Sequence, residues 1–358
     1  MKVIVDGRAL QGNVSGIGKY LLSALQSFAS LNVTCVILHN KAIDQKVKDK
    51  VESLGHITYH DKHMLAKNSL LWFVIRLPFL FKQFDFDFIW FPNNFGTFTS
   101  SRYRLLLTVH DAVYFDYPET MNWPEKFLSK IFLKKSILKS DVIWFVSKFT
   151  SNRYTEIFNI SRKKIIIGSD IDRSLFCKRN FELCSRDVLD KYNIKGKYIL
   201  FVGTTEPRKN LQFLSSISGG IGQLGLSIVV VGSKGWGEGN TDSKIIYPGY
   251  IHDNDLPSIF KFAELYISPS LYEGFGLPLI ESQAMGTPVI CANNSAQTEV
   301  ISGSGIAISG WVRGEWLSAI EVIIDNRDKY SDLALKNSNK FSMDLVAESV
   351  VKEMHDFS

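Results

Sequence analysis

The stretch at residues 267–290, ISPSLYEGFGLPLIESQAMGTPVI, decides the fold. An apolar strand end leads into a glycine-framed turn, and a helix is expected to begin at Leu277 or Pro278, because proline suits a first helical turn. Strand, glycine turn and helix form the unit from which parallel α/β sheets are built. The stretch therefore predicts an α/β fold, and it raises the question of why Glu273 and Glu281 stand on either side of the turn.

The same alternation of apolar runs and helical patterns repeats along the chain. With 358 residues, the chain is long for a single hydrophobic core. We therefore expect two Rossmann-like, doubly wound α/β domains, at residues 1–175 and 176–340, with a terminal helix at 341–358 that packs back on the N-terminal domain. The expected strands lie at residues 3–6, 35–39, 88–91, 105–110 and 142–147 in the first domain and 198–203, 227–232, 265–270 and 288–292 in the second.

Composition places the chain among soluble globular proteins, with 45% hydrophobic and 22% charged residues. Residues 1–180 hold 26 Lys and Arg against 15 Asp and Glu, whereas residues 181–358 hold 15 against 21. The basic half is thus expected to meet an anionic partner. No nucleic-acid partner is expected.

The cysteines and the N-terminus indicate a cytoplasmic protein. The four cysteines form no CxxC pair, which disfavours a zinc site or a disulfide framework. The start, MKVIVDGRAL, lacks the long apolar core of a signal peptide.

Residues 70–81, LLWFVIRLPFLF, form the most apolar run, but twelve residues are too few to cross a bilayer. Lys67, Arg76 and Lys82 surround aromatic and aliphatic neighbours. Two interpretations stay open: a buried helix of the first domain, or a helix in contact with an anionic membrane surface.

The turn of the opening stretch suits an anion. The backbone N–H groups of Phe275, Gly276 and Leu277 are expected at a helix N-terminus, where glycines at 274 and 276 let a phosphate approach. Glu281 follows Leu277 by about one turn. Two acids around an anion site suggest a ligand with phosphates and hydroxyls, such as a nucleotide sugar. Alternatively, both acids only favour the helix dipole, by a few tenths to about 1 kcal/mol each.

A second strand and turn at residues 202–211, VGTTEPRKNL, ends in a basic pair just before a helix expected near Asn210. Arg208 can hold a pyrophosphate with its fork, and Lys209 can hold it as a point charge. The alternative is a solvated basic pair.

These two stretches, with SGIGKY at 15–20, TVHD at 108–111 and VSKFTSNRY at 146–154, resemble the retaining GT-B glycosyltransferases of the glycosyl transferases group 1 family, or glycosyltransferase family 4, and mannosyltransferases in particular. The resemblance implies a GT-B fold, in which two Rossmann-like domains face each other across a cleft. It is strong over residues 198–300 and looser in the first half.

The resemblance also implies roles for single residues. Glu273 would lie near the sugar and the reacting phosphate, and Glu281 would bind the ribose hydroxyls. Arg208 and Lys209 would neutralise the diphosphate in place of a metal. The other implied sites are the glycine loop with Gly16 and Gly18, the donor-site turn Gly274, Phe275, Gly276 and Leu277, His110 beside the sugar, and Tyr250 and Ile251 near the base.

Departures and alternatives remain at several positions. Thr204 stands where many members of the family have an arginine, so one cation is missing or is supplied by Arg208. His110 and Asp111 also fit a strand end with a capping aspartate. The acidic triplets at 85–87 and 170–172 invite a metal-binding interpretation, but neither has a third oxygen ligand nearby. We expect no metal and no cofactor.

The sequence thus favours a retaining, metal-independent glycosyltransferase that moves a sugar, with mannose from GDP-mannose favoured, to a hydroxyl of a lipid-linked glycan. The expected setting is bacterial surface polysaccharide synthesis, O-antigen or capsule, by a cytoplasmic enzyme peripheral on the inner face of the membrane. Three alternatives stay open: transfer to a soluble small acceptor, nucleotide-sugar epimerisation, and non-catalytic binding of a sugar nucleotide.

Overall fold

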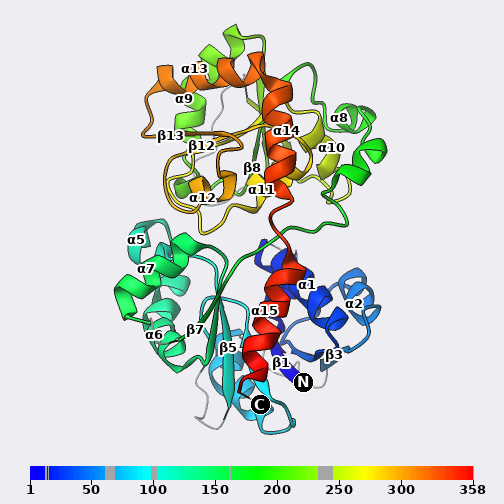
Figure 1. Ribbon diagram of the computed structural model, residues 1–358, viewed down its shortest axis with the longest axis vertical. Coiled ribbons are helices and arrows are strands. Elements are labelled where there is room, and N and C mark those ends of the chain that lie inside the picture. Colours follow the sequence, from blue (N-terminus) through cyan, green and yellow to red (C-terminus); the bar gives the residue numbers. More distant parts are fainter. Residues whose placement is uncertain are drawn as a thin grey trace. The chain divides into compact units, whose positions relative to one another are not determined.

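The computed structural model describes residues 1–12, 14, 16–60, 69–97, 103–121, 123–160, 163–232 and 245–357. The chain divides into two compact units (Figure 1). Unit 1 comprises Met1–Asp170 and Ser342–Ser358, and unit 2 comprises Ile171–Phe341. The chain therefore leaves unit 1, completes unit 2 and returns to unit 1.

Unit 1 is built on a seven-stranded sheet of order β3-β2-β1-β4-β5-β6-β7, in which every pairing of neighbouring strands is parallel. The central strands are buried on both faces because helices cover the two sides of the sheet. The strands are β1 (Lys2–Asp6), β2 (Thr34–Leu38), β3 (Ile57–His60), β4 (Phe88–Phe91), β5 (Arg104–Val109), β6 (Val142–Phe145) and β7 (Lys164–Ile167).

One face of this sheet is covered by α1 together with the returning α15, which lie side by side in Figure 1. Ser27 Oγ of α1 donates to Asp344 Oδ1 of α15, across 317 positions of sequence. The helices and helical turns of unit 1 are η1 (Gly7–Leu10), α1 (Gly16–Ser30), α2 (Gln45–Glu52), α3 (Ser69–Leu71), the π-helical turn η2 (Trp72–Arg76), α4 (Leu77–Phe81), α5 (Val113–Asp116), η3 (Pro118–Thr120), α6 (Trp123–Lys139), α7 (Lys148–Phe158) and α15 (Met343–His355).

Unit 2 has a six-stranded, fully parallel sheet of order β10-β9-β8-β11-β12-β13. Helices α9 and α13 pack their apolar faces against one side of it, around Trp316. The strands are β8 (Tyr198–Val202), β9 (Ser227–Val231), β10 (Ile245–Gly249), β11 (Leu265–Ser268), β12 (Val289–Ala292) and β13 (Ile306–Ile308). The helices are η4 (Lys178–Leu183), α8 (Asp187–Lys191), η5 (Pro207–Lys209), α9 (Leu211–Gln223), α10 (Leu256–Lys261), α11 (Leu277–Ala284), α12 (Gln297–Ile301), α13 (Arg313–Asp325) and α14 (Arg327–Ser338).

Both sheets are doubly wound, so the expected fold class is confirmed. In each sheet the strand order reverses at one point, between β1 and β4 in unit 1 and between β8 and β11 in unit 2. Loops that leave neighbouring strands at such a point run in opposite directions and open a crevice at the carboxyl ends of the strands, where ligands bind. The crevice of unit 2 is therefore bounded by the loops that follow β8 and β11.

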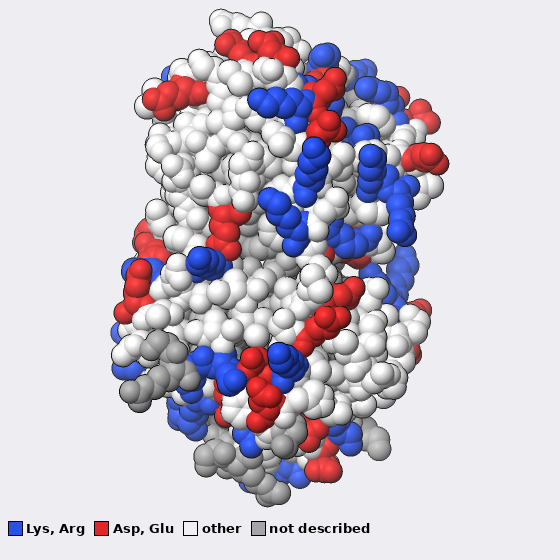
Figure 2. Space-filling view, viewed as in Figure 1, with Lys and Arg blue, Asp and Glu red and all other residues white. Residues whose placement is uncertain are grey.

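The positive charge divides between the units less sharply than between the halves of the sequence. Unit 1 carries 24 Lys and Arg against 18 Asp and Glu, and unit 2 carries 17 against 18. The difference shrinks because basic residues at 171–180 belong to unit 2 and acidic residues of α15 belong to unit 1. Figure 2 shows Lys and Arg gathered along the α8 and α10 side of unit 2, so basic surface is not confined to unit 1.

Each of the two interpretations of residues 70–81 agrees with one side of this segment. One side of α3, η2 and α4 is buried, including Trp72 and Phe73, as expected for a helix of the first domain. The other side leaves Ile75 and Phe79 exposed. None of the helices in the described part of the chain is both long and apolar enough to span a membrane.

Candidate functional site

Two loops meet at the crevice of unit 2. The first follows β8 and forms the 3-10 turn η5, which contains Arg208 and Lys209. The second follows β11 and carries Glu273 toward the N-terminus of α11. Leu271 N–H of the second loop donates to the Arg208 carbonyl at 2.7 Å, which fixes the two loops to each other.

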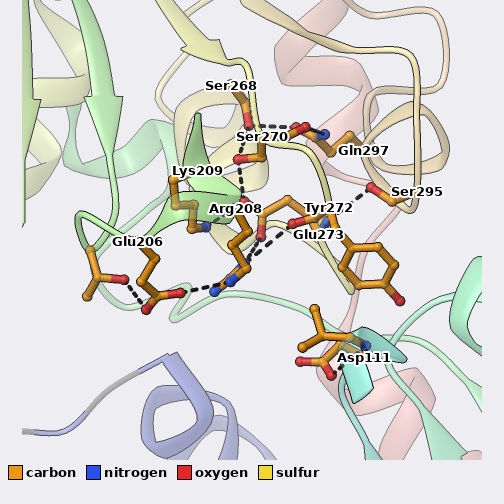
Figure 3. A network of polar contacts seen from close by, with 12 residues as sticks. Asp111, Glu206, Arg208, Lys209, Ser268, Ser270, Tyr272, Glu273, Ser295 and Gln297 are labelled. Carbon is orange, nitrogen blue, oxygen red and sulfur yellow. Dashed lines mark hydrogen bonds and ion pairs between the residues drawn. The ribbon is translucent and has the colours of Figure 1, made fainter. Parts of the chain in front are cut away.

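Arg208, Lys209 and Glu273 form one cluster (Figure 3). Arg208 Nη1 lies 3.2 Å from Glu273 Oε2, and the Lys209 ammonium donates to Glu273 Oε1. Lys209 and Glu273 are each 8% exposed, whereas the Arg208 side chain keeps 24% of its surface. The structure thus brings these three residues together, and the alternative of a solvated basic pair is wrong for Lys209, which is buried.

The Glu273 carboxylate is held in its ionised form. Burial alone would raise the pKa of Glu273, but the charges of Lys209 and Arg208 and hydrogen bonds from Lys209 and Ser270 outweigh it, and the pKa falls to about 2. Burial, aided by Arg208, lowers the pKa of the Lys209 ammonium, while Glu273 opposes this shift. Because the folded pKa of Glu273 lies below its unfolded value of 4.5, its contribution to stability is present above pH 4.5 and is lost as the pH falls toward 2.

Glu206 is a member of the cluster that the sequence analysis missed. Its Oε2 accepts from Arg208 Nε at 2.8 Å, and its Oε1 accepts from the Thr204 hydroxyl at 2.5 Å. The guanidinium is thus held between two carboxylates, with Glu206 on one side and Glu273 on the other (Figure 3). The sequence signal that could have identified Glu206 is an acidic residue two positions before Arg208. Thr204, the departure from the family pattern, orients Glu206 and supplies no cation.

Two serines also bond to Glu273. Ser270 Oγ donates to Glu273 Oε1 at 2.8 Å, and the Glu273 N–H donates to Ser295 Oγ at 3.0 Å. Ser268, at the end of β11, donates to Gln297 Oε1 at 2.6 Å, and Gln297 in turn donates to the Ser270 carbonyl at 3.1 Å. No sequence signal singled out these residues, since serine is common where a strand ends.

The N-terminus of α11 has the geometry that the opening stretch predicted. The helix begins at Leu277, and Gly276 is its N-cap with a φ of +97°. Pro278 has no N–H, and the Leu279 N–H is bonded to the Gly276 carbonyl at 2.9 Å, so the amides that can reach a ligand precede Pro278. Gly274 precedes Phe275 in this turn, and the Phe275 ring packs on Phe341.

Glu281 and the proposed base-binding residues lie at other places in unit 2. Glu281 is buried in α11, four residues after its start. Tyr250 is 64% exposed and Ile251 is buried, just beyond the end of β10. In the sheet, β10 is separated from β8 by β9, so Tyr250 lies about 10 Å to one side of the cation pair in the strand-to-strand direction.

His110 follows β5 in unit 1 and is held on three sides. Its Nε2 lies 2.7 Å from the Pro92 carbonyl, its N–H donates to Asn94 Oδ1 at 2.6 Å, and its ring meets the edge of Tyr20 at 4.9 Å between centroids. A carbonyl can only accept, so Nε2 carries the proton and Nδ1 is the acceptor atom of the ring. Asp111 Oδ1 accepts from the Val113 N–H at 3.3 Å, but the N-cap of α5 is Ala112, so Asp111 is not the capping residue.

Gly16 and Gly18 lie in the first turn of α1 rather than in a loop. A Cβ on Gly18 would lie 2.4 Å from the Ala9 carbonyl oxygen, so this glycine lets α1 pack on η1. Asn13 and Ser15 of the same motif lie outside the described residues.

Two family models match the chain. The glycosyl transferases group 1 model matches residues 187–334, and the glycosyltransferase family 4 model matches residues 14–167, so together they cover most of both units. The chain belongs to glycosyltransferase family 4. It is therefore an enzyme of the glycosyltransferase class, as the motifs predicted.

Curated relatives and solved structures agree with this assignment. The glycosyltransferase is 27% identical over 337 residues to the O-antigen chain mannosyltransferase B of Escherichia coli, covering 86% of each chain. It is 26% identical over 227 residues to the O-antigen chain mannosyltransferase RfbU of Salmonella typhimurium, covering 61% of this chain and 60% of the relative. The crystal structure of Anabaena HepE with UDP and glucose superposes with a TM-score of 0.70 at 14% identity, covering 99% of this chain and 100% of that one, and shows the same GT-B fold.

The acidic triplets of the glycosyltransferase serve local structure. Asp87 Oδ2 accepts from the Lys2 N–H at 2.7 Å, and Asp172 Oδ1 accepts from the Ser174 N–H at 3.0 Å. Within the described ranges, no group of three His, Cys, Asp or Glu side chains is placed to hold a metal ion.

Gly276→Ala is expected to destabilise unit 2 of the glycosyltransferase by about 1–2 kcal/mol, because an L-residue at positive φ is strained. The added Cβ would also lie 3.0 Å from Leu279 Cδ1. Thermal and urea unfolding measure the effect. Gly314→Ala, in the first turn of α13 with no atom within 4 Å of its Cβ, is the control and should be neutral or slightly stabilising. Equal loss in both variants would contradict the strain argument.

Burial lowers the pKa of His110 from 6.5 to about 4, with the Pro92 hydrogen bond opposing the shift. Above pH 6.5 the imidazole is neutral in both the folded and the unfolded chain, so it costs nothing. As the pH falls from 6.5 to 4, only the unfolded chain gains the proton, and stability should fall by up to about 3 kcal/mol.

His110→Gln should flatten this pH dependence in urea unfolding followed by circular dichroism between pH 7 and pH 4. His355→Gln, which removes an exposed histidine of α15 in the same unit, is the control. An unchanged pH dependence in His110→Gln would show that His110 is not the group responsible.

Proposed function

We propose that this glycosyltransferase transfers mannose from a nucleoside diphosphate donor, and that Arg208 and Lys209 bind the diphosphate. The observation that carries the proposal is the convergence of these two cations, with Glu273, between the loops after β8 and β11. The N-terminus of α11 adds N–H groups to the same crevice. The names of the relatives support mannose, and GDP is the favoured nucleotide.

Cleavage of the sugar–phosphate bond leaves negative charge on the diphosphate. Fixed cations and N–H dipoles stabilise that charge without reorganising during the reaction, which is the term that often dominates enzymatic rate enhancement. The two cations supply the positive charge that a divalent metal supplies in other transferases. We therefore propose a metal-independent reaction.

Retention of configuration is inferred from the family resemblance, and the contacts of Glu273 favour attack from the front face over a covalent intermediate. A covalent nucleophile has to be free to reach the anomeric carbon, whereas the Glu273 carboxylate is bonded to Lys209, Arg208 and Ser270. In the proposed reaction the bond from the anomeric carbon to the phosphate oxygen breaks, and the acceptor oxygen bonds to that carbon. The acceptor proton passes to the departing phosphate oxygen. Glu273 then keeps both cations in place.

Other residues take supporting roles in the proposal. Glu281 binds the ribose hydroxyls. Neutral His110 presents Nδ1 as an acceptor for a sugar hydroxyl. Gly16 and Gly18, at the start of α1, take part in donor binding, and Tyr250 and Ile251 bind the base.

The proposed acceptor is a hydroxyl of a lipid-linked glycan in bacterial O-antigen or capsule synthesis. The relatives named O-antigen chain mannosyltransferases support it. An acceptor anchored in a bilayer requires the enzyme to work at the membrane surface, so we propose a peripheral enzyme on the cytoplasmic face.

Calorimetric binding of GDP, UDP, GDP-mannose and UDP-glucose in EDTA tests the donor site. Binding of one nucleotide series without metal, lost in Arg208→Ala, is the expected result. Arg179→Ala, which removes an exposed arginine of η4 in the same unit, should bind as the parent does. Binding that requires Mg²⁺ or Mn²⁺ would overturn metal independence. Absence of nucleotide binding under either condition would overturn the function itself.

A further inference from the structure

Helix α6 exposes a stripe of apolar side chains. Phe127 is 46% exposed, Ile131 is 43% exposed and Leu138 is 47% exposed. Residues separated by four and eleven positions lie within about 40° of one another around a helix, so these three side chains share one face. Phe132, Leu133 and Ile137 are buried on the opposite face, so α6 is apolar both toward the sheet and away from it.

Lysines flank this stripe on both sides. Residues 126–140, KFLSKIFLKKSILKS, contain no acidic residue. A helix face with apolar side chains in its middle and lysines along both edges is the pattern of helices that lie in the interface of anionic membranes. The exposed lysines are Lys126, Lys130, Lys134, Lys135 and Lys139.

A second apolar element lies in the same layer. The connections from β3 to β4, which contains α3, η2 and α4, and from β5 to β6, which contains α6, advance in the same direction along the sheet. Right-handed crossovers therefore place both on one face of the sheet. Phe73 of η2 and Phe132 of α6 meet with ring centroids 5.4 Å apart, which confirms that the two elements are neighbours.

The outer side of this second element is apolar as well. Leu70, Leu71, Ile75 and Phe79 are between 42% and 56% exposed, and the Lys82 ammonium lies 5.3 Å from the Phe79 ring. We define the basic-apolar surface as the exposed side chains of α6 together with these four residues and Lys82. Its apolar side chains come from neighbouring elements, and its charged groups at residues 126–139 of α6 are all positive.

We propose that the basic-apolar surface docks the enzyme on a bilayer that contains anionic lipids. Lysine ammonium groups pair with the lipid phosphates, and the aromatic and aliphatic side chains enter the headgroup region. A water-soluble acidic protein would match the charge but would leave seven apolar side chains without a matching environment. The inference rests on the proposed function only in that a lipid-linked acceptor gives docking a purpose.

Vesicle co-sedimentation with the full chain tests the proposal, using phosphatidylcholine with and without phosphatidylglycerol. Binding is expected only to the anionic vesicles. Lys130→Glu/Lys134→Glu should weaken it by at least about tenfold, since each lysine near such a surface contributes about fivefold. Lys46→Glu/Lys50→Glu on α2 makes the same change of charge elsewhere on unit 1 and should stay close to the parent.

Phe127→Ser/Ile131→Ser separates apolar insertion from charge attraction. These side chains are exposed, so the variant should fold. At high salt, where charge attraction is screened, it should lose most of the vesicle binding that the parent keeps. The proposal is overturned if the parent does not bind anionic vesicles, if the α2 control loses as much as the α6 variant, or if the serine variant binds as the parent does. Nucleotide calorimetry on the same variants keeps the two proposals apart, because the diphosphate-binding residues Arg208 and Lys209 lie in unit 2. Vesicle binding without nucleotide binding would overturn the proposed function and leave the proposed docking surface standing.

Discussion

Replacing Arg208 with alanine is expected to lower kcat/KM with the sugar nucleotide by about 10²- to 10³-fold, which is the usual cost of losing one group that stabilises developing negative charge. The effect should fall on activity more than on stability. The Arg208 side chain is 24% exposed, and Glu273 keeps Lys209 as its partner after the change.

Arg208→Lys tests whether the fork or only the charge is needed. The guanidinium contacts Glu206 through Nε and Glu273 through Nη1, and an ammonium cannot reproduce that bridge. We expect intermediate activity, measured by initial rates over a range of donor concentrations, with Arg179→Ala as control. Activity of Arg208→Ala within a few-fold of the parent would remove Arg208 from the donor site.

Lys209→Met is expected to be the most destabilising of these substitutions, by about 3–5 kcal/mol, because it leaves the buried Glu273 carboxylate without its closest counter-charge. Methionine keeps the length and apolar stem of the lysine, so packing changes little. Urea unfolding of unit 2 measures the loss, and donor binding should fail in parallel.

The double variant Lys209→Met/Glu273→Gln supplies the control for the ion pair. Removing both charges relieves the unpaired carboxylate, so the double variant should be more stable than Lys209→Met alone. If the destabilisation of the two single changes is simply additive, the pair is not coupled, and the role assigned to Glu273 in holding the cations is wrong.

The strands that the sequence failed to predict are β3, β7, β10 and β13, and these are the edges of the two sheets. A central strand of a parallel sheet is covered on both faces and reads as a continuous apolar run, as FIWF at 88–91 and VIWF at 142–145 do. An edge strand pairs on one side only. The sequence ITYH of β3 and the partly exposed KIII of β7 carry too few buried side chains to be distinguished from a loop.

The cluster of Arg208, Lys209 and Glu273, which we propose as the donor site, was predictable to the extent that its chemistry is rare in sequence. An Arg-Lys pair at a strand end and an acid before a glycine turn both stand out, and both belong to the cluster. Glu206 and Ser270 are recognisable only after folding, because their roles depend on which atoms the loops bring within hydrogen-bonding distance. The start of α11 at Leu277 was predictable because proline fixes it.

The return of the chain to unit 1 has a consequence for biosynthesis. On the ribosome, α15 emerges only after the whole of unit 2. The hydrogen bond from Ser27 to Asp344 therefore cannot form until more than 300 intervening residues have been made. The continuous unit, unit 2, can fold as soon as it leaves the exit tunnel, whereas the apolar face of α1 stays open to chaperones until residues 342–358 have been made. Nascent chains stalled before residue 342 should therefore protect unit 2 from protease and leave unit 1 sensitive.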